Sequence, residues 1–437
     1  MLRRALVAGL GCFVVATIAV VAAAGRAATA DIDADFAAFW AAATPSAAAR
    51  AGDTLVADGV SFDAAWARLK NGRPYAAAPT GTIDMPIRIG GNDPFPNTID
   101  VPENYDPSRR WPVRVQLHGG IGREESAPQR GANRIAGEPQ IYVFPSARAD
   151  AAWWHHAQVE NIETLLDRVK RAYNVDESRI YLTGVSDGGT GTYFLAMRDA
   201  TPWAACLPLI GDPGVLLNES ADTDGQLYPT NAAACPFFIV NAEHDPLYPA
   251  GVLAPMIGMF TRAGVKLEFH RQPTGGHDVS WWPAVRAPYE AFVHAHPRNP
   301  YPDRLSWETE RTDRYNRVDW FVIDELGTTS SDVPLLDENM DDEGKEMYPR
   351  AEPSGRVDIE RYGNAIKAFA RGVRRFTLLL SPDVFDFRKP ITVTVNGNTA
   401  FSGVVKKDPA VLLKWAARDN DRTMLFGAEV SVRVTNR

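Results

Sequence analysis

The chain has no excess of positive charge and very little cysteine. Its 437 residues carry 46 Lys and Arg against 54 Asp and Glu, a net charge of −8. Such a chain has no general attraction for phosphate backbones, so we expect no nucleic-acid partner. With 45% hydrophobic residues, it is also unlike disordered, collagen-like or coiled-coil chains. The length and the apolar content predict one large packed domain and a smaller one.

The first 30 residues have the composition of an export signal. A basic start at Met1–Arg4 precedes the mostly apolar stretch Ala5–Ala24, and Ala28-Thr29-Ala30 offers the small residues that signal peptidase requires. We predict a signal peptide over 1–30, with cleavage before Asp31, and a secreted or periplasmic protein. The alternative is an uncleaved membrane anchor, because about twenty apolar residues can just span a bilayer.

Removal of that segment leaves two of the three cysteines, Cys206 and Cys235. In an oxidising compartment this is the count for one disulfide. Each cysteine opens a predicted buried strand, so a bridge is geometrically accessible if the two strands are parallel neighbours. Two separate buried thiols remain the alternative at this stage.

Three regions follow the signal segment. Residues 31–80 are Ala-rich and helical in period, with Ser61 as an expected N-cap. From 81 to 298, short apolar runs alternate with helical stretches, which predicts a doubly wound, mainly parallel sheet of the α/β class. Its expected strands include Met85–Ile89, Thr98–Val101, Val113–Leu117, Ile141–Phe144, Arg179–Leu182 and Val265–His270, and its expected helices are Val159–Tyr173, Gly188–Met197, Leu253–Arg262 and Pro283–His294.

Residues 299–437 have a different pattern, with strand-like alternation and few helices. Expected strands are Arg317–Ile323, Arg375–Leu380 and Ile391–Val395, and Asn396-Gly397 is a strong hairpin signal. Only Asp408–Ala417 has a clear helical pattern here. We therefore predict a β-rich, sandwich-like C-terminal domain. The acidic stretch Asp332–Glu346 lacks the ligand spacing of a calcium loop, and we expect no metal and no organic cofactor.

The motif with the clearest chemistry is Gly184-Val185-Ser186-Asp187-Gly188. A serine between a buried strand and a helix must occupy a tight turn, and flanking glycines let the strand and the helix approach closely. The predicted strand before the motif and the predicted helix after it supply that context. Ser186 is therefore the candidate nucleophile.

A serine hydroxyl needs a base, and the base needs an orienting carboxylate. In this fold the acid and then the histidine follow the serine along the chain. Asp245 comes just after a predicted strand, and His277 lies in the glycine-rich loop after the next strand. We assign Asp245 as the acid and His277 as the base. The rival acids are Glu243 and Asp212, and the rival bases are His270 and His244.

The tetrahedral intermediate of acyl transfer also needs donors for its oxyanion. His118-Gly119-Gly120-Ile121 follows the strand Val113–Leu117, and glycine lets backbone N–H groups face a site. We assign the oxyanion hole to the N–H groups of Asp187 and Gly120, with Ile121 as the alternative to Gly120. His118 is expected to be a structural hydrogen-bonding residue.

Together these motifs resemble secreted α/β-hydrolase serine esterases. Val101–Pro107, Leu117–Gly120, Val175–Gly189 and Gly276-His277 carry the resemblance, which covers about half of the chain. The groups concerned are polyhydroxyalkanoate depolymerase-like, feruloyl-esterase-like and prolyl-oligopeptidase-like hydrolases. The resemblance implies a triad of Ser186, Asp245 and His277. The sequence departs from many depolymerases at Gly120 and Asp187, which puts a polymer substrate in doubt.

Two tryptophan pairs border the predicted site, Trp153-Trp154 and Trp281-Trp282. Exposed indoles offer flat apolar surface to a ligand, and we expect Trp154 and Trp281 to contact substrate. The sequence thus predicts a serine esterase acting on a small-molecule or polymeric ester. A peptidase of the same fold is the first alternative, and a non-catalytic binding protein on a hydrolase scaffold is the second.

Overall fold

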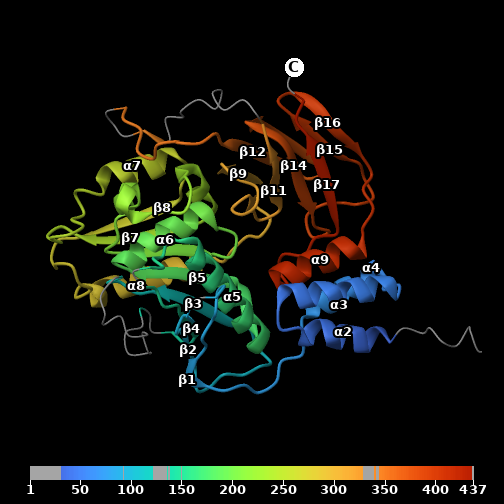
Figure 1. Ribbon diagram of the computed structural model, residues 1–437, viewed down its shortest axis with the longest axis horizontal. Coiled ribbons are helices and arrows are strands. Elements are labelled where there is room, and N and C mark those ends of the chain that lie inside the picture. Colours follow the sequence, from blue (N-terminus) through green and yellow to red (C-terminus); the bar gives the residue numbers. More distant parts are fainter. Residues whose placement is uncertain are drawn as a thin grey trace, which may run out of the picture.

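The computed structural model describes residues 31–91, 93–121, 135, 138–148, 150–327, 339–340 and 344–435. The predicted signal peptide over 1–30 lies outside these residues. Figure 1 shows a large α/β body, a β-rich body and a small group of helices beside the latter. In the described part of the chain, no helix combines the length and the apolar character needed to cross a bilayer.

The α/β body is built on an eight-stranded sheet in the order β1-β2-β4-β3-β5-β6-β7-β8. Strands β4, β3, β5, β6, β7 and β8 are parallel, and β1 and β2 run antiparallel at one edge. The strands are β1 (Gly81–Asp84), β2 (Thr98–Val101), β3 (Trp111–Leu117), β4 (Ile141–Phe144), β5 (Val175–Val185), β6 (Ala205–Leu209), β7 (Phe237–Ala242) and β8 (Leu267–Gln272). This arrangement confirms the predicted α/β class.

Helices cover both faces of this sheet (Figure 1). Alternate side chains of β7 enter different cores: Phe237 and Ile239 join the core under α5, α6 and α7, while Phe238 and Val240 join the core under α8. Burial of the sheet on both faces explains why its strands are continuous apolar runs. The helices are α5 (His156–Ala172), α6 (Asp187–Arg198), α7 (Ala254–Arg262) and α8 (Trp282–Ala295).

The strand predicted at Met85–Ile89 is wrong. The edge strand β1 lies just before it, at Gly81–Asp84, and Ile87 forms only an isolated bridge with Phe95. Pro86 explains the difference, because proline has no N–H to donate to a strand ladder. Ile87 is fully buried, so the apolar signal in this segment comes from packing and not from strand pairing.

The C-terminal body contains two sheets, ordered β10-β11-β14-β17 and β16-β15-β13-β12-β9. Side chains from both sheets share one core that includes Trp307, Phe376 and Val393, as in a sandwich. Asn396 and Gly397 both have positive φ between β15 and β16, which confirms the predicted hairpin turn. The strands are β9 (Arg304–Thr309), β10 (Arg317–Val318), β11 (Phe321–Leu326), β12 (Gly355–Tyr362), β13 (Ala365–Arg371), β14 (Val373–Leu380), β15 (Ile391–Val395), β16 (Asn398–Gly403) and β17 (Ala428–Arg433).

The segment 31–80 forms three helices, and they pack on the C-terminal body. These helices, α2 (Ile32–Ala41), α3 (Pro45–Ala57) and α4 (Phe62–Asn71), share a core with α9 (Pro409–Asp419). Leu55 and Leu412 are fully buried there. Ser61 caps α4 as predicted, because its hydroxyl accepts the Ala64 N–H at 3.2 Å. The N-terminal segment and the late helix α9 therefore form one helical cluster.

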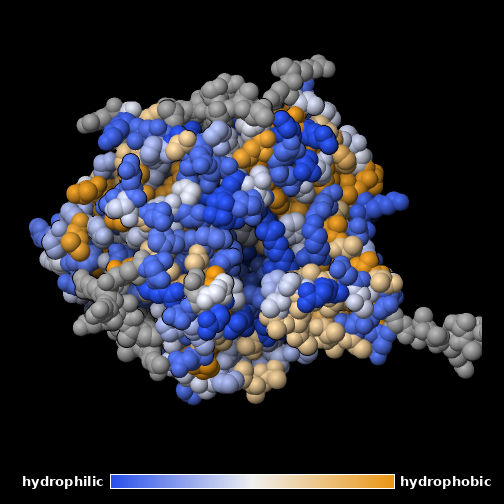
Figure 2. Space-filling model, viewed as in Figure 1, coloured by the Kyte–Doolittle hydropathy of each residue, from blue (hydrophilic) through white to orange (hydrophobic). Residues whose placement is uncertain are grey.

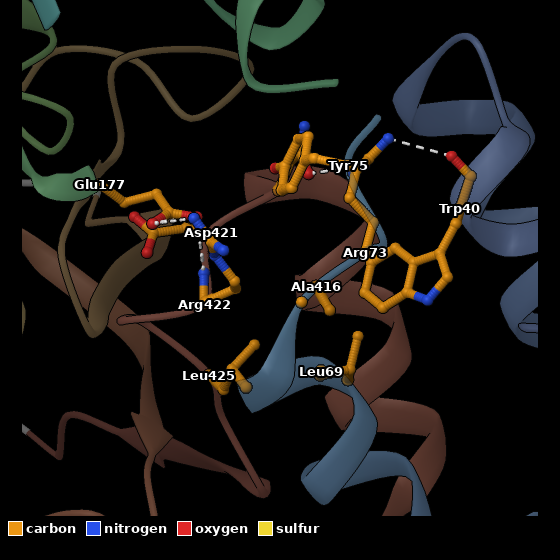
Figure 3. Close-up of a pocket in the computed structure, with 11 residues that line it drawn as sticks. Trp40, Leu69, Arg73, Tyr75, Glu177, Ala416, Asp421, Arg422 and Leu425 are labelled. Atoms are coloured by element: carbon orange, nitrogen blue, oxygen red, sulfur yellow. Dashed lines mark hydrogen bonds and ion pairs between the residues drawn. The ribbon is translucent and has the colours of Figure 1, made fainter. Parts of the chain in front are cut away.

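A polar junction joins the three bodies (Figure 3). Arg73 donates to Asn420 Oδ1 at 2.9 Å, and the Arg422 guanidinium binds the Glu177 carboxylate at 2.7 Å. These side chains surround a cavity of about 20 Å³, which has room for about one water molecule. Figure 2 shows hydrophilic residues gathered along the line where the α/β and C-terminal bodies meet. Charged and polar side chains therefore make up much of this boundary.

Candidate active site

Ser186 lies in a sharp turn between β5 and α6. Its φ of 57° and ψ of −120° are rare for a residue with a side chain, and such strain is typical of functional turns. A Cβ on Gly184 would lie 2.0 Å from the Gly188 carbonyl oxygen, so glycine is required where the strand and the helix meet. The turn presents the serine at the N-terminus of α6, as the motif predicts.

The structure brings the three predicted triad residues into one line. Ser186 Oγ lies 2.7 Å from His277 Nε2. His277 Nδ1 lies 2.9 Å from Asp245 Oδ2 and 3.1 Å from Asp245 Oδ1. The histidine side chain is 21% exposed and the aspartate side chain is 0% exposed. A proton on Nδ1 would therefore bind a buried carboxylate and leave Nε2 to accept the serine proton.

The backbone after β7 fixes the Asp245 carboxylate. Its Oδ1 accepts the N–H groups of Leu247 and Tyr248 at 2.8 and 3.0 Å. Hydrogen bonds of this kind hold a carboxylate in one rotamer. Asp245 is thus oriented before any substrate binds.

The rival acids and bases have other partners. Glu243 binds Arg271 at 2.6 Å, and Asp212 Oδ1 accepts the Gly214 N–H at 2.7 Å. His270 lies 3.0 Å from a Glu268 oxygen and stacks on Phe238. His244 lies two residues after β7, and the side chains of Ser186 and Asp245 hydrogen-bond to His277 instead. The geometry therefore favours Asp245 and His277 over these alternatives.

The loop after β3 lies directly against the serine turn. A Cβ on Gly119 would lie 2.8 Å from Ser186 Cβ, and Gly120 has a φ of 71°. The Ile121 N–H donates to the Asp187 carboxylate at 2.8 Å. Ile121 is therefore already engaged, which favours the Gly120 and Asp187 N–H groups as the oxyanion donors.

His118 links this loop to the segment after β4 through hydrogen bonds. Its Nε2 accepts the Ala147 N–H at 3.0 Å, and its Nδ1 lies 2.9 Å from the Gly119 carbonyl oxygen. Burial lowers the pKa of His118, which keeps the ring neutral with its proton on Nδ1. Both ring nitrogens are used within the protein, so His118 has the structural role that the sequence predicts.

Tyr248 is a site residue that sequence reasoning missed. Its ring meets the His277 ring edge to face at 5.4 Å between centroids. Burial and the nearby Asp187, Asp212 and Asp245 carboxylates raise the pKa of Tyr248 to about 12, so the phenol keeps its proton. The only sequence signal was its position three residues after Asp245.

The structure does not provide the open indoles expected at Trp154 and Trp281. Trp154 is 7% exposed and donates to the Ala221 carbonyl at 2.8 Å. Trp281 is 6% exposed, and a Cβ on Gly275 would lie 3.1 Å from its ring. Trp281 thus packs beneath the loop that carries His277. Both indoles are buried and present little surface to a ligand.

Cys206 and Cys235 are joined as a disulfide across neighbouring strands. Strands β6 and β7 are parallel neighbours, and the two Cα atoms are 6.1 Å apart, within the usual range for a bridge. Both cysteines are fully buried. The bridge lies in the core under α6, at the amino-terminal ends of β6 and β7 and thus at the edge of the sheet opposite the triad.

Three potential metal ligands, Glu138, Glu290 and His294, lie together outside the triad, with their ligand atoms within 4.8 Å of one another. Each of them already has a partner within the protein. Arg114 lies 3.5 Å from Glu290, and His294 lies 2.9 Å from Glu138. We assign no metal role to this group.

The strand order, the turn after β5 and the loops after β7 and β8 define an α/β-hydrolase fold with a serine, a histidine and an aspartate at the carboxyl ends of its strands. No family model matches the chain. Over 119 residues the chain is 26% identical to a bifunctional acetylxylan esterase/xylanase from Neocallimastix patriciarum. That stretch is 26% of this chain and 17% of the relative, so the match spans a minor part of both proteins.

Solved structures of low sequence identity were also found. A thermostable esterase is 20% identical with a TM-score of 0.41, over 50% of this chain and 63% of its own. The CE1 ferulic acid esterase of Anaeromyces mucronatus is 15% identical with a TM-score of 0.38, over 50% and 90%. A putative dipeptidyl aminopeptidase IV from Bacteroides ovatus is 16% identical with a TM-score of 0.42, over 49% and 36%.

Proposed function

We propose that the protein hydrolyses carboxylic esters through an acyl-enzyme on Ser186. The observation that carries the proposal is the hydrogen-bonded line from Ser186 Oγ through His277 to the buried Asp245. An isolated hydroxyl is a poor nucleophile at neutral pH, and this line supplies both the base and its orienting carboxylate.

In the first step His277 Nε2 takes the Ser186 proton while Oγ attacks the ester carbonyl carbon. The Gly120 and Asp187 N–H groups then stabilise the oxyanion. When the intermediate collapses, the C–O bond to the alcohol breaks and His277 returns its proton to the leaving oxygen. In the second step water attacks the acyl-enzyme by the same route, which releases the carboxylic acid and restores Ser186.

Turnover of p-nitrophenyl acetate and covalent labelling by a fluorophosphonate test this proposal. The wild-type protein should do both, and Ser186→Ala should lose the labelling and at least a thousandfold of kcat, as is typical of triad removal. Ser402→Ala, an exposed serine on β16, is the matched control and should retain both. A folded wild-type protein inactive in both assays would refute the proposal.

The substrate class is part of the same proposal. The matched relative is named as an acetylxylan esterase/xylanase, so acetylated sugars are the first esters to test, beside feruloyl and hydroxyalkanoate esters. Aminoacyl p-nitroanilides test the peptidase alternative, which predicts faster amide turnover than ester turnover. Ligand binding that is unchanged in Ser186→Ala, without turnover in the wild type, would instead indicate a binding protein.

We also propose that the protein is exported and that cleavage occurs before Asp31. N-terminal sequencing of protein recovered from the periplasm or the medium should begin at Asp31. A membrane-bound protein that begins at Met1 would instead indicate the uncleaved anchor.

A further inference from the structure

The Asp187 side chain ties the serine turn to the loop after β3. Its Oδ2 accepts the Ile121 N–H at 2.8 Å. Asp187 directly follows Ser186, and Ile121 directly follows Gly120. One hydrogen bond therefore joins the two backbone segments that carry the proposed oxyanion donors.

These segments are close for a second reason. Strands β3 and β5 are parallel neighbours, with Leu117 in register with Gly184, and Gly119 packs against Ser186. The β3 side of this contact is the start of the segment that connects β3 to β4, and its first described residues include the two glycines Gly119 and Gly120. Glycine leaves the backbone free to adopt several conformations, so the loop needs an added restraint to keep the Gly120 N–H in one direction.

A carboxylate suits this restraint. Hydrogen bonds from a backbone N–H to an ionised acceptor are shorter and stronger than neutral ones. Asp187 is also the first residue of α6, where the helix dipole favours a negative charge. The bond occupies the Ile121 N–H, so the loop presents the preceding amide, that of Gly120, to the substrate.

We propose that Asp187 is a positioning residue that holds the oxyanion loop in its stabilising geometry. This inference rests on the proposed esterase function and adds a role for the side chain to that of the backbone N–H. Correct alignment of oxyanion donors stabilises the transition state more than the bound ester. Loss of the carboxylate should therefore lower kcat and leave KM nearly unchanged.

Asp187→Ala and Asp187→Asn in the full chain test the inference with p-nitrophenyl acetate. We expect Asp187→Ala to lower kcat by about tenfold to a hundredfold, less than the loss of an entire oxyanion donor. Asn retains an oxygen that can accept the Ile121 N–H, although more weakly. Asp187→Asn should therefore recover most of kcat. The matched control is Asp53→Ala, an exposed aspartate on α3.

A trifluoromethyl ketone inhibitor adds a readout that a general loss of structure would not give. Its adduct with the serine carries an oxyanion, so its Ki should rise in Asp187→Ala by the factor by which kcat/KM falls. Circular dichroism and the melting temperature establish that each variant is folded. An unfolded Asp187→Ala leaves Asp187→Asn as the test, since the inference requires near-normal kcat from that variant.

The outcomes distinguish this inference from the proposed function. If the wild type turns over esters but Asp187→Ala keeps its kcat, or Asp187→Asn loses as much kcat as Asp187→Ala, the positioning role is overturned and the esterase function stands. A rise in KM without a fall in kcat would indicate a substrate contact and also overturn it. A wild type without ester turnover overturns both.

Discussion

Glu310 forms an ion pair between the two large bodies, and the contribution of this pair to the free energy of unfolding can be measured. It follows β9 and binds Arg198, the last residue of α6, through two hydrogen bonds of 2.6 and 2.8 Å. The side chains are 1% exposed for Arg198 and 3% for Glu310. Arg198 also donates to the Gln226 carbonyl, and the Tyr228 hydroxyl donates to Glu310. The pair is therefore buried and almost fully hydrogen-bonded.

Glu310→Gln removes the charge and keeps the shape. Removal of one partner from a buried ion pair costs about 3–5 kcal/mol, because the remaining charge is buried without compensation. The variant retains one oxygen acceptor, and Arg198 retains the Gln226 carbonyl. We therefore expect a loss of about 3 kcal/mol in the free energy of unfolding, at the lower end of that range.

Urea denaturation at pH 7 measures this loss, with Glu325→Gln as the matched control. Glu325 pairs with Arg374 at 2.8 Å, but the side chains are 41% and 53% exposed, and such pairs contribute less than about 1 kcal/mol. Although burial raises the pKa of Glu310, the hydrogen bonds and charge of Arg198 outweigh it and lower that pKa. The pair is therefore fully stabilising above the unfolded pKa, and the difference from Glu310→Gln should shrink as the pH falls below about 4. A loss below 1 kcal/mol at pH 7 would refute the reasoning.

Two further predictions concern stability. Burial raises the pKa of Asp319 to about 7, so the folded protein holds a proton that the unfolded chain releases near pH 4. The Asp319 carboxyl group therefore destabilises the fold increasingly as the pH rises from about 4 to 7. Asp319→Asn should raise the melting temperature above that of the wild type by more at pH 8 than at pH 4. An equal gain at both pH values would contradict this. The Cys206–Cys235 bridge spans 29 residues, so Cys206→Ala should cost about 3–4 kcal/mol in urea, and dithiothreitol should destabilise the wild type but not the variant.

Local sequence patterns were sufficient to predict the part of the fold that carries the site. Continuous apolar runs predicted the parallel strands, and the spacing of Ser186, Asp245 and His277 predicted which loops meet. Each residue could be recognised from its position just after a predicted strand. A doubly wound sheet brings the carboxyl ends of its parallel strands to one edge, so residues at these positions lie close together. The order of the strands in the sheet could not be predicted in this way.

Burial was harder to predict than secondary structure. Trp154 and Trp281 were expected to be open because they lie in loops beside the site, but each packs against a neighbouring loop. The strand expected at Arg317–Ile323 is divided into β10 and β11 by Asp319, which has positive φ. Neither the packing of loops nor a single left-handed residue leaves a periodic signal in a sequence.

The contact between the bodies could not be predicted from the sequence, because its residues have the composition of a solvated surface. Arg198, Glu310, Glu177 and Arg422 are charged and far apart in the chain, yet their side chains are at most 9% exposed. Arg198 is at the carboxyl end of α6, and Glu177 is within β5. Deletion of 299–437 would remove the charged partners of both side chains. Both elements also flank Ser186. A loss of activity on deletion could therefore result from damage to the α/β body as readily as from loss of a substrate-binding domain. Single substitutions on the outer faces of the C-terminal sheets are a better test of that domain's role.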